Sequence, residues 1–266
     1  NGHLESQYDN VIGIYLDGVY ATAPYEALNT GSINLEGNNS AGIYLEGGAR
    51  ALNDSGGVIS VGTGSVAIYG NFAGDIENSG EIYIKDNSSG IYTENSGFTE
   101  NNKLISGNGN KETGIYSVNS AGVLNSSSGE IRLTGDGNVG IYNISSTNTQ
   151  NDNMIFLVSS GNSKTPGIGI YSDGSISNTG NINVYDGSVG IYAFNGNLVH
   201  SGIISSGDRG IGIYADNETV SLNISSDIKI GNNAVGVNGK NNTAITANGS
   251  LNIGTDSFGY VLESGT

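Results

Sequence analysis

The sequence contains no cysteine and no tryptophan, and it has only two prolines, two histidines and nine lysines and arginines among 266 residues. The lack of cysteine removes the thiol nucleophile, and only His3 and His200 remain as possible general bases. Nucleophilic catalysis is therefore poorly supported by the composition.

Positive charge is scarce as well, because 25 acidic residues against nine basic ones give a net charge of -16. An acidic protein repels nucleic acids and anionic lipid surfaces, so we expect neither as a partner. The sequence shows no signal peptide and no apolar run long enough to span a bilayer, and we expect no membrane insertion by this segment. The chain begins and ends inside a repeat pattern, which predicts that residues 1–266 are one piece of a longer protein.

Three residues, Gly-Ile-Tyr, recur along the whole chain at intervals of 21 to 29 residues. Identical copies begin at residues 13, 42, 90, 114, 140, 169, 190 and 212. Degenerate copies begin where the interval requires them, at Ala67, Gly236 and Gly259. A period of this size is typical of a solenoid, in which each repeat stacks on its neighbours and no single central core exists.

Each repeat contains short segments in which apolar and polar residues alternate. In the repeat that begins at Gly169 these are 169–171, 175–177 and 181–185, separated by Gly, Asn and Asp. Alternation of period two predicts strands, and Gly, Asn and Asp suit corners that need positive φ. We therefore predict an all-β fold: a right-handed parallel β-helix (solenoid) of about eleven rungs of three short strands, triangular in cross-section. At ~4.8 Å per rung it would form a rod of roughly 50 Å, a single unit over 1–266.

The alternation within a strand also predicts which residues face inward. Apolar Ile211, Ile213 and Ala215 alternate with Gly212 and Tyr214. Since the interior must be apolar, we expect the isoleucine face to point inward, and Gly and Tyr to form two ladders on the outside. The corner asparagines are expected to turn inward and form an amide ladder along the axis.

The Gly-Ile-Tyr strands, the Asn-Ser/Thr-Gly corners and strands such as 80–84 (Gly-Glu-Ile-Tyr-Ile) resemble the passenger of large bacterial autotransporter adhesins, most of all the fusobacterial outer-membrane adhesins. The resemblance covers essentially the whole chain. It implies a location on the cell surface and a parent protein with a C-terminal outer-membrane barrel. It also implies non-catalytic attachment to host cells or to other bacteria, through a glycan or a protein receptor. The lack of cysteine is compatible with passage through a periplasm in an unfolded state.

The predicted tyrosine ladder is the first candidate for a binding surface, because exposed aromatic faces stack on sugars and anchor protein partners. The interpretation that we favour for most of the ladder is that the rings stack on one another and stiffen the rod. Binding is expected where the ladder lies beside a longer loop, and such loops are predicted near 17–27, 145–153 and 161–167. The candidate binding residues are Tyr15, Tyr20, Tyr25, Tyr142 and Tyr171.

An acidic residue follows two positions after tyrosine in several repeats, and Asp17 and Glu46 fall on adjacent predicted rungs. Two carboxylates roughly 5 Å apart could serve a retaining glycosidase or bind Ca²⁺. A solvated acidic stripe is the alternative that we favour, so we expect no catalytic residue, no metal site and no cofactor. A polysaccharide-degrading β-helix enzyme and a passive stalk that presents a distal binding domain remain rival interpretations.

Overall fold

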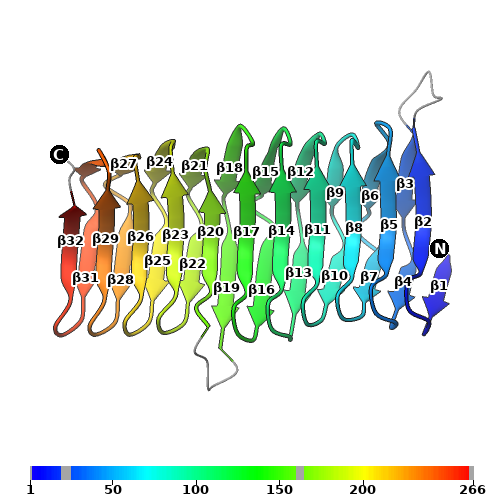
Figure 1. The fold of residues 1–266 in the computed structure, drawn as a ribbon, viewed down its shortest axis with the longest axis horizontal. Coiled ribbons are helices and arrows are strands. Elements are labelled where there is room, and N and C mark those ends of the chain that lie inside the picture. The colour runs from blue at the N-terminus through cyan, green and yellow to red at the C-terminus, as the bar shows by residue number, and fades with distance from the viewer. Residues whose placement is uncertain (1, 19–24, 160–164, 264–266) are drawn as a thin grey trace.

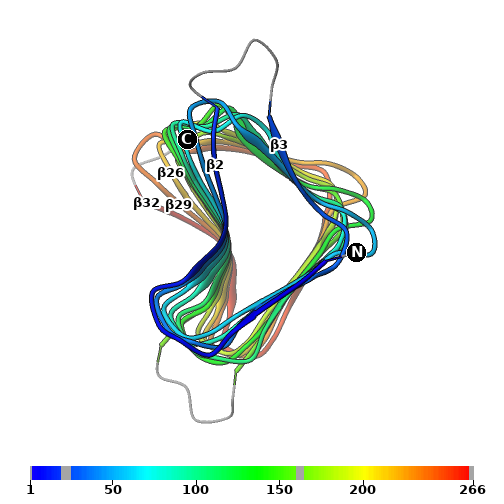
Figure 2. The ribbon, with the colours of Figure 1, turned by 90° about the vertical axis from the view of Figure 1, so that its right-hand side faces the viewer.

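The structure, a computed structural model, describes residues 2–18, 25–159 and 165–263. These residues form 32 short strands and no helix, and the chain winds through three parallel sheets in turn. Figure 1 shows the strands stacked side by side into a straight rod, and Figure 2 shows the roughly triangular section. Viewed from the N-terminal end the chain turns clockwise as it recedes, which makes the solenoid right-handed (Figure 2). The predicted fold class is confirmed.

Every third strand belongs to the same sheet. Sheet 1 contains β1 (His3–Ser6), β4 (Ser32–Leu35), β7 (Val58–Val61), β10 (Glu81–Ile84), β13 (Leu104–Gly107), β16 (Glu130–Thr134), β19 (Met154–Val158), β22 (Asn181–Val184), β25 (Ile203–Ser206), β28 (Asp227–Ile230) and β31 (Ser250–Ile253). Sheet 2 contains β2 (Ile12–Asp17), β5 (Ala41–Glu46), β8 (Val66–Asn71), β11 (Ser89–Glu94), β14 (Thr113–Val118), β17 (Val139–Ile144), β20 (Ile168–Ser172), β23 (Val189–Phe194), β26 (Ile211–Asp216), β29 (Val235–Lys240) and β32 (Phe258–Glu263). Sheet 3 contains β3 (Glu26–Asn29), β6 (Arg50–Asn53), β9 (Ile76–Asn78), β12 (Phe98–Asn101), β15 (Gly122–Asn125), β18 (Asn148–Asn151), β21 (Ser175–Asn178), β24 (Asn197–His200), β27 (Thr219–Leu222) and β30 (Ala244–Ala247).

The interior is a narrow column of aliphatic side chains supplied by all three sheets. Ile43, Ile68, Ile91 and Ile115 stack on successive strands of sheet 2 and are fully buried, as are the central isoleucines of sheet 1. A column of this kind grows by one layer per rung, so each rung is stabilised by the two rungs that cover it.

The corner after sheet 3 contains the predicted amide ladder. Each asparagine donates from Nδ2 to Oδ1 of the next one, over distances of 2.6 to 2.8 Å. The ladder consists of Asn29, Asn53, Asn78, Asn101, Asn125, Asn151 and Asn178. These side chains are buried, and the bonds between them satisfy polar groups that would otherwise be costly inside the rod.

The glycine column of sheet 2 is placed differently from the prediction, which put it on the outside. A Cβ built at Gly114 would lie 2.6 Å from the carbonyl oxygen of Gly140 and 2.6 Å from Cγ2 of Ile131, a fully buried residue. Glycine therefore faces inward, next to the inward-facing Ile115. The residue before it faces outward instead, so Ile211 is partly exposed rather than in the core. Two consecutive residues, Gly114 and Ile115, are therefore both buried, and this breaks the strict alternation on which the prediction relied. Figure 2 shows the bend in sheet 2 that accompanies it.

Only part of the predicted loops can be described. The segment 145–153 contains β18, so it supplies the sheet-3 strand of its rung. Residues 19–24 of the loop predicted near 17–27 and residues 161–164 of the loop predicted near 161–167 lie outside the described residues. Nowhere in the described ranges is there a helix with the length and hydrophobicity that a membrane span requires.

Candidate functional site

The tyrosines of sheet 2 form the predicted ladder on the outside of the rod. Ring centroids on neighbouring strands are 4.5 to 5.6 Å apart, and their planes differ by 7 to 33°. The ladder consists of Tyr15, Tyr44, Tyr69, Tyr92, Tyr116, Tyr142, Tyr171, Tyr192 and Tyr214. Each rung places its ring above the previous one because the strands pair in register.

This stacking decides what the ladder can present to a partner. The faces of the inner rings cover one another, so Tyr142 and Tyr171, at 4.8 Å and 9°, offer their edges and hydroxyls rather than their faces. Tyr15 is the first ring and is 54% exposed, with a single ring neighbour, Tyr44, among the described residues. At the other end, Nζ of Lys240 lies 5.8 Å from the ring centroid of Tyr214. Stacking on a sugar face is therefore unavailable within the ladder, whereas edge contacts and hydrogen bonds remain available.

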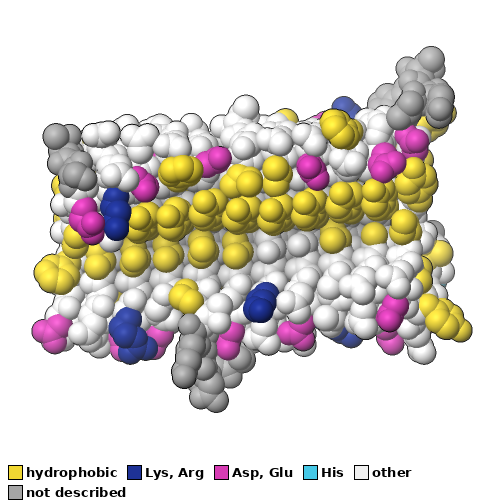
Figure 3. All heavy atoms as spheres, viewed as in Figure 1, with side chains coloured by type: hydrophobic (Ala, Val, Ile, Leu, Met, Phe, Trp, Pro, Cys, Tyr) yellow, Lys and Arg dark blue, Asp and Glu magenta, His cyan; other side chains and the backbone are white. Residues whose placement is uncertain are grey.

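A second row of side chains runs beside the tyrosines, and we call it the outer column. It consists of the residue before each glycine of the Gly-Ile-Tyr copies, or before Ala67 in the copy that lacks the glycine: Ile12, Ala41, Val66, Ser89, Thr113, Val139, Ile168, Val189, Ile211, Val235 and Phe258. Sheet 2 is concave toward solvent at the bend (Figure 2). We call the surface formed by the tyrosine ladder and the outer column on this concave sheet the groove, and Figure 3 shows its apolar side chains in rows along this face.

The outer column was missed in the sequence because strict alternation assigned it to the core. Its apolar side chains are continuous in the C-terminal half and are interrupted by Ser89 and Thr113 in the middle. At the N-terminal end a hollow is lined by the outer-column residues Ile12 and Val66 together with Tyr44. Contiguous apolar surface of this extent is uncommon on a soluble monomer, and it usually marks an interaction surface.

Two hydroxyls of the ladder, those of Tyr44 and Tyr192, are protonated donors at neutral pH. The pKa of Tyr44 is raised to about 12, mainly by partial burial in the stack and secondly by a hydrogen bond to Glu46. The pKa of Tyr192 is also raised to about 12, mainly by partial burial and secondly by the electrostatic effect of the neighbouring Tyr214. The carboxylate of Glu46 accepts hydrogen bonds from both Tyr15, at 3.0 Å, and Tyr44, at 2.9 Å. The groove therefore offers a row of hydrogen-bond donors along one apolar wall.

The candidate tyrosines do not form one cluster. Tyr142 and Tyr171 are adjacent in the ladder, and Tyr15 lies at its N-terminal end. Tyr25 precedes β3 and is 52% exposed, on the sheet-3 side of the corner and away from the ladder. Tyr20 lies outside the described residues. Of the described candidates, Tyr15, Tyr142 and Tyr171 thus belong to one long surface.

The acidic column is less regular than the spacing indicated. Asp17 pairs in register with Glu46, as predicted, but Glu46 pairs next with Asn71, and Glu94 pairs next with Val118. Among the described residues no group of three or more Asp, Glu and His side chains is arranged to hold a metal ion. Glu46 is engaged by two tyrosine hydroxyls, which fits a role in orienting the end of the ladder.

Three ionisable side chains of the described residues, those of Glu112, His200 and Glu218, are buried inside the rod. Burial raises the pKa of Glu112 to about 8 and that of Glu218 to about 7, although each carboxyl accepts a backbone hydrogen bond. Burial lowers the pKa of His200 to about 4. Because His200 is fully buried, this candidate base cannot reach a substrate on the surface.

Comparisons with protein-family models, with curated proteins and with solved structures found no match.

Proposed function

We propose that this chain is a non-catalytic binding segment of a bacterial cell-surface adhesin, which attaches the cell to a host cell or to another bacterium. The observation that carries the proposal is the groove on sheet 2, where a stacked tyrosine wall runs from Tyr15 to Tyr214 beside a largely aliphatic column that Ser89 and Thr113 interrupt. The receptor is a protein or a glycan that lies along this groove. The resemblance of the repeats to autotransporter passengers supports the cellular setting.

Physical chemistry supports a binding role for the groove. Apolar surface gains roughly 25 cal/mol for each Å² removed from water, so a partner that covers several outer-column residues gains substantially. Val189 and Ile211 are adjacent in this column and partly exposed. The aromatic rings are already held by stacking, so binding does not have to order them. The net charge of -16 keeps such a surface soluble in the free protein.

The proposed location is extracellular, with the segment held at the outer membrane by its parent protein. A rigid rod suits this setting, because continuous in-register sheets transmit position along the axis without hinges. Neither a cofactor nor a nucleic acid is required by the mechanism, which uses only apolar contact and tyrosine hydroxyls.

The test compares binding of the wild-type segment to intact epithelial cells, to immune cells and to a glycan array with that of groove variants. Val189→Ser/Ile211→Ser removes apolar surface but leaves a residue that the same column already contains at Ser89. Tyr142→Ala/Tyr171→Ala removes the middle of the ladder. The matched control is Val199→Ser on the outer face of sheet 3, between Ser177 and Ser221.

We expect wild type and Val199→Ser to bind alike, and both groove variants to lose binding while circular dichroism shows them folded. Equal binding by all four proteins would place the receptor surface elsewhere. A folded wild type that binds nothing would favour the rival proposal of a passive stalk, for which the mutual coverage of the ring faces is the supporting observation. The enzyme rival requires polysaccharide cleavage that Glu46→Gln abolishes.

A further inference from the structure

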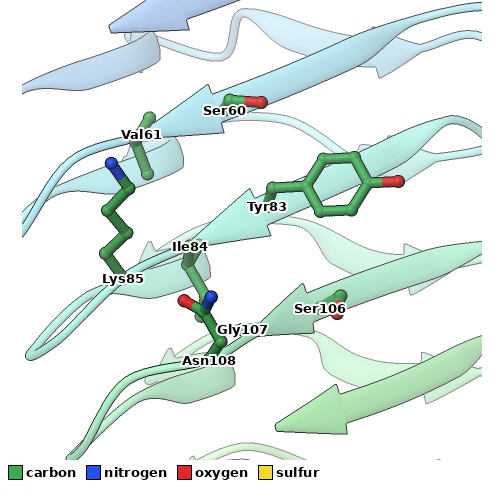
Figure 4. Close-up of a pocket in the computed structure, with 8 residues that line it drawn as sticks. All are labelled: Ser60, Val61, Tyr83, Ile84, Lys85, Ser106, Gly107 and Asn108. Carbon is green, nitrogen blue, oxygen red and sulfur yellow. The ribbon is translucent and has the colours of Figure 1, made fainter. Parts of the chain in front are cut away.

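One tyrosine outside the ladder stands alone on the outer face of sheet 1. Tyr83 belongs to β10, and its partners on the neighbouring strands are Ser60 in β7 and Ser106 in β13. Figure 4 shows the ring between these two small side chains. Both faces of the ring are therefore free of aromatic neighbours, in contrast to the rings of the ladder, and the residue is 39% exposed.

The ring is held in one orientation by its own strand. The hydroxyl of Tyr83 donates to Oε2 of Glu81 at 2.7 Å, and Nζ of Lys103 lies 3.4 Å from Oε1 of the same carboxylate. An aromatic ring that is fixed before binding loses little entropy when a ligand stacks on it. The open face is thus pre-organised as a platform.

A hollow of about 260 Å³ lies beside this platform. Its polar lining consists of the side chains of Ser60, Ser106, Lys85 and Asn108 (Figure 4). None of these four side chains makes a hydrogen bond or ion pair with another side chain or backbone group in the part of the chain that the structure describes. The volume lies just below the ≈ 300–1,000 Å³ of small-molecule pockets, which fits one sugar ring rather than several.

Lys85 gives the hollow a charge that is rare on this molecule. Most other described cations lie within 4.0 Å of a carboxylate, as Lys103 does with Glu81 and Arg132 with Glu130. Lys85 has no such partner among the described residues. In a chain of net charge -16, an unpaired ammonium in a hollow that Tyr83 also lines favours an anionic ligand over a cationic one.

We propose that the hollow beside Tyr83 binds a single sugar residue that carries a carboxylate. The C–H face of the sugar stacks on the ring of Tyr83, and its hydroxyls bond to Ser60, Ser106 and Asn108. Its carboxylate pairs with Lys85. This inference deepens the proposed function, on which it rests for its biological setting. It concerns a different sheet from the groove, so either surface can fail without the other.

Saturation-transfer NMR with free monosaccharides tests the site directly. The probes are glucuronic acid and N-acetylneuraminic acid, with glucose and galactose as neutral comparisons. A site with one stacking ring and one charge predicts affinity in the millimolar range for the acidic sugars. We expect at least tenfold weaker signals for the neutral sugars, because they leave Lys85 unpaired.

Two variants use residues that neighbouring rungs already contain, so that folding is preserved. Tyr83→Ser gives the column three serines in a row, and Lys85→Asn copies Asn108 one rung later. The control is Phe156→Asn, which copies Asn183 of the next rung and removes an aromatic ring that the guanidinium of Arg132 covers at 5.1 Å. Thermal unfolding of each variant checks that the rod is intact.

The expected result is that Tyr83→Ser abolishes transfer to the acidic sugars and Lys85→Asn reduces it to the level of the neutral ones, while Phe156→Asn has no effect. No transfer in the wild type, or unchanged transfer in Tyr83→Ser, overturns the site. Equal binding of neutral and acidic sugars overturns the carboxylate requirement. Loss of cell attachment in the groove variants with retained sugar binding would separate the two surfaces.

Discussion

His200 shows how one substitution ends a ladder. It occupies the position that asparagine holds in the preceding rungs, and its Nδ1 accepts a hydrogen bond of 3.0 Å from Nδ2 of Asn178. Its Nε2 has no partner among the described residues, and the next residue in the column is Leu222. The imidazole is therefore neutral, and protonation would place an unsolvated charge inside the rod.

The first prediction concerns the acid sensitivity caused by His200. Its pKa is about 4 in the folded protein against 6.5 when unfolded, so the unfolded state binds the proton more tightly. The free energy of unfolding is therefore unaffected by His200 above pH 6.5. It decreases as the pH falls toward 4, by up to roughly 3 kcal/mol. His200→Asn should remove that loss. Urea unfolding at pH 7 and pH 4.5 measures it, and an equal drop in both proteins contradicts the argument.

Glu112 and Glu218 predict the opposite pH dependence. Their pKa values in the folded protein, about 8 and about 7, lie above the value of 4.5 that applies when they are unfolded. The stability that the protonated, buried carboxyls contribute is complete below pH 4.5. It is lost as the pH rises through 7 to 8, because the unfolded state releases these protons more readily. Glu112→Gln should flatten the decline in melting temperature between pH 5 and pH 8.5. Glu94→Gln, at the edge of the groove, serves as the control and should leave the decline unchanged.

The inward orientation of glycine gives a third prediction. Gly114→Ala places a methyl group against the backbone of Gly140 and the side chain of Ile131, and such overpacking costs about 1–3 kcal/mol. Thr113→Ala, one residue earlier on the outer column, should cost well under half of that. Denaturant unfolding compares the two. If Gly114→Ala were neutral, the glycine would face solvent, as strict alternation predicts.

At the level of the strand, the sequence predicted structure best where a residue type favours a single backbone conformation or a single side-chain environment. The strands, the corners and the asparagine ladder followed from alternation and from residues that favour positive φ. Tyr116 faces outward as predicted, since it follows the inward Ile115 in a regular stretch. The residue before glycine was assigned wrongly, because the bend is a property of backbone packing that alternation does not encode. The groove could not be predicted because the outward orientation of the residue before glycine was not known.

Other features of the surface had no signal in the repeat. Tyr83 is one aromatic residue in a column that otherwise varies, and only the register places Ser60 and Ser106 beside it. Stacking of the tyrosine rings was the favoured interpretation for most of the ladder, but whether neighbouring rings cover each other's faces depends on side-chain orientation. These are relations between rungs, which a single sequence specifies only once the exact pairing is known.

The asparagine ladder leads to the fourth prediction. Asn101 accepts from Asn78 and donates to Asn125, each over 2.8 Å, in a fully buried column. Asn101→Ala leaves a buried donor and a buried acceptor without their strongest partners, at about 1–3 kcal/mol for each group. We expect a loss of about 2–4 kcal/mol in the free energy of unfolding. Asn102→Ala removes only a partly buried bond to Glu77 and should cost less than about 1 kcal/mol. Similar losses for both variants would argue against a special role for the ladder.

At the scale of the whole molecule, stability is shared along the rod rather than stored in a centre. Each rung contacts the rungs before and after it in all three sheets, so the free energy of unfolding is a sum of rungs and interfaces. The two ends expose apolar residues, among them Leu4, Ile12, Phe258 and Leu262. A shorter rod therefore has the same uncovered ends and fewer interfaces to offset them.

Removal of two complete rungs tests this view. Deletion of residues 90–139 joins Ser89 to Gly140. Ser89, Thr113 and Val139 hold equivalent register positions, so the joined strand keeps its register and β8 pairs directly with the remainder of β17. We expect a folded protein with a lower melting temperature and a urea m-value smaller by roughly a fifth, since m scales with the surface exposed on unfolding. Deletion of 90–127, which ends in the corner before β16, breaks the register and should prevent folding. An unchanged melting temperature after the in-register deletion would mean that the rungs unfold independently, because only then does the number of neighbours not matter.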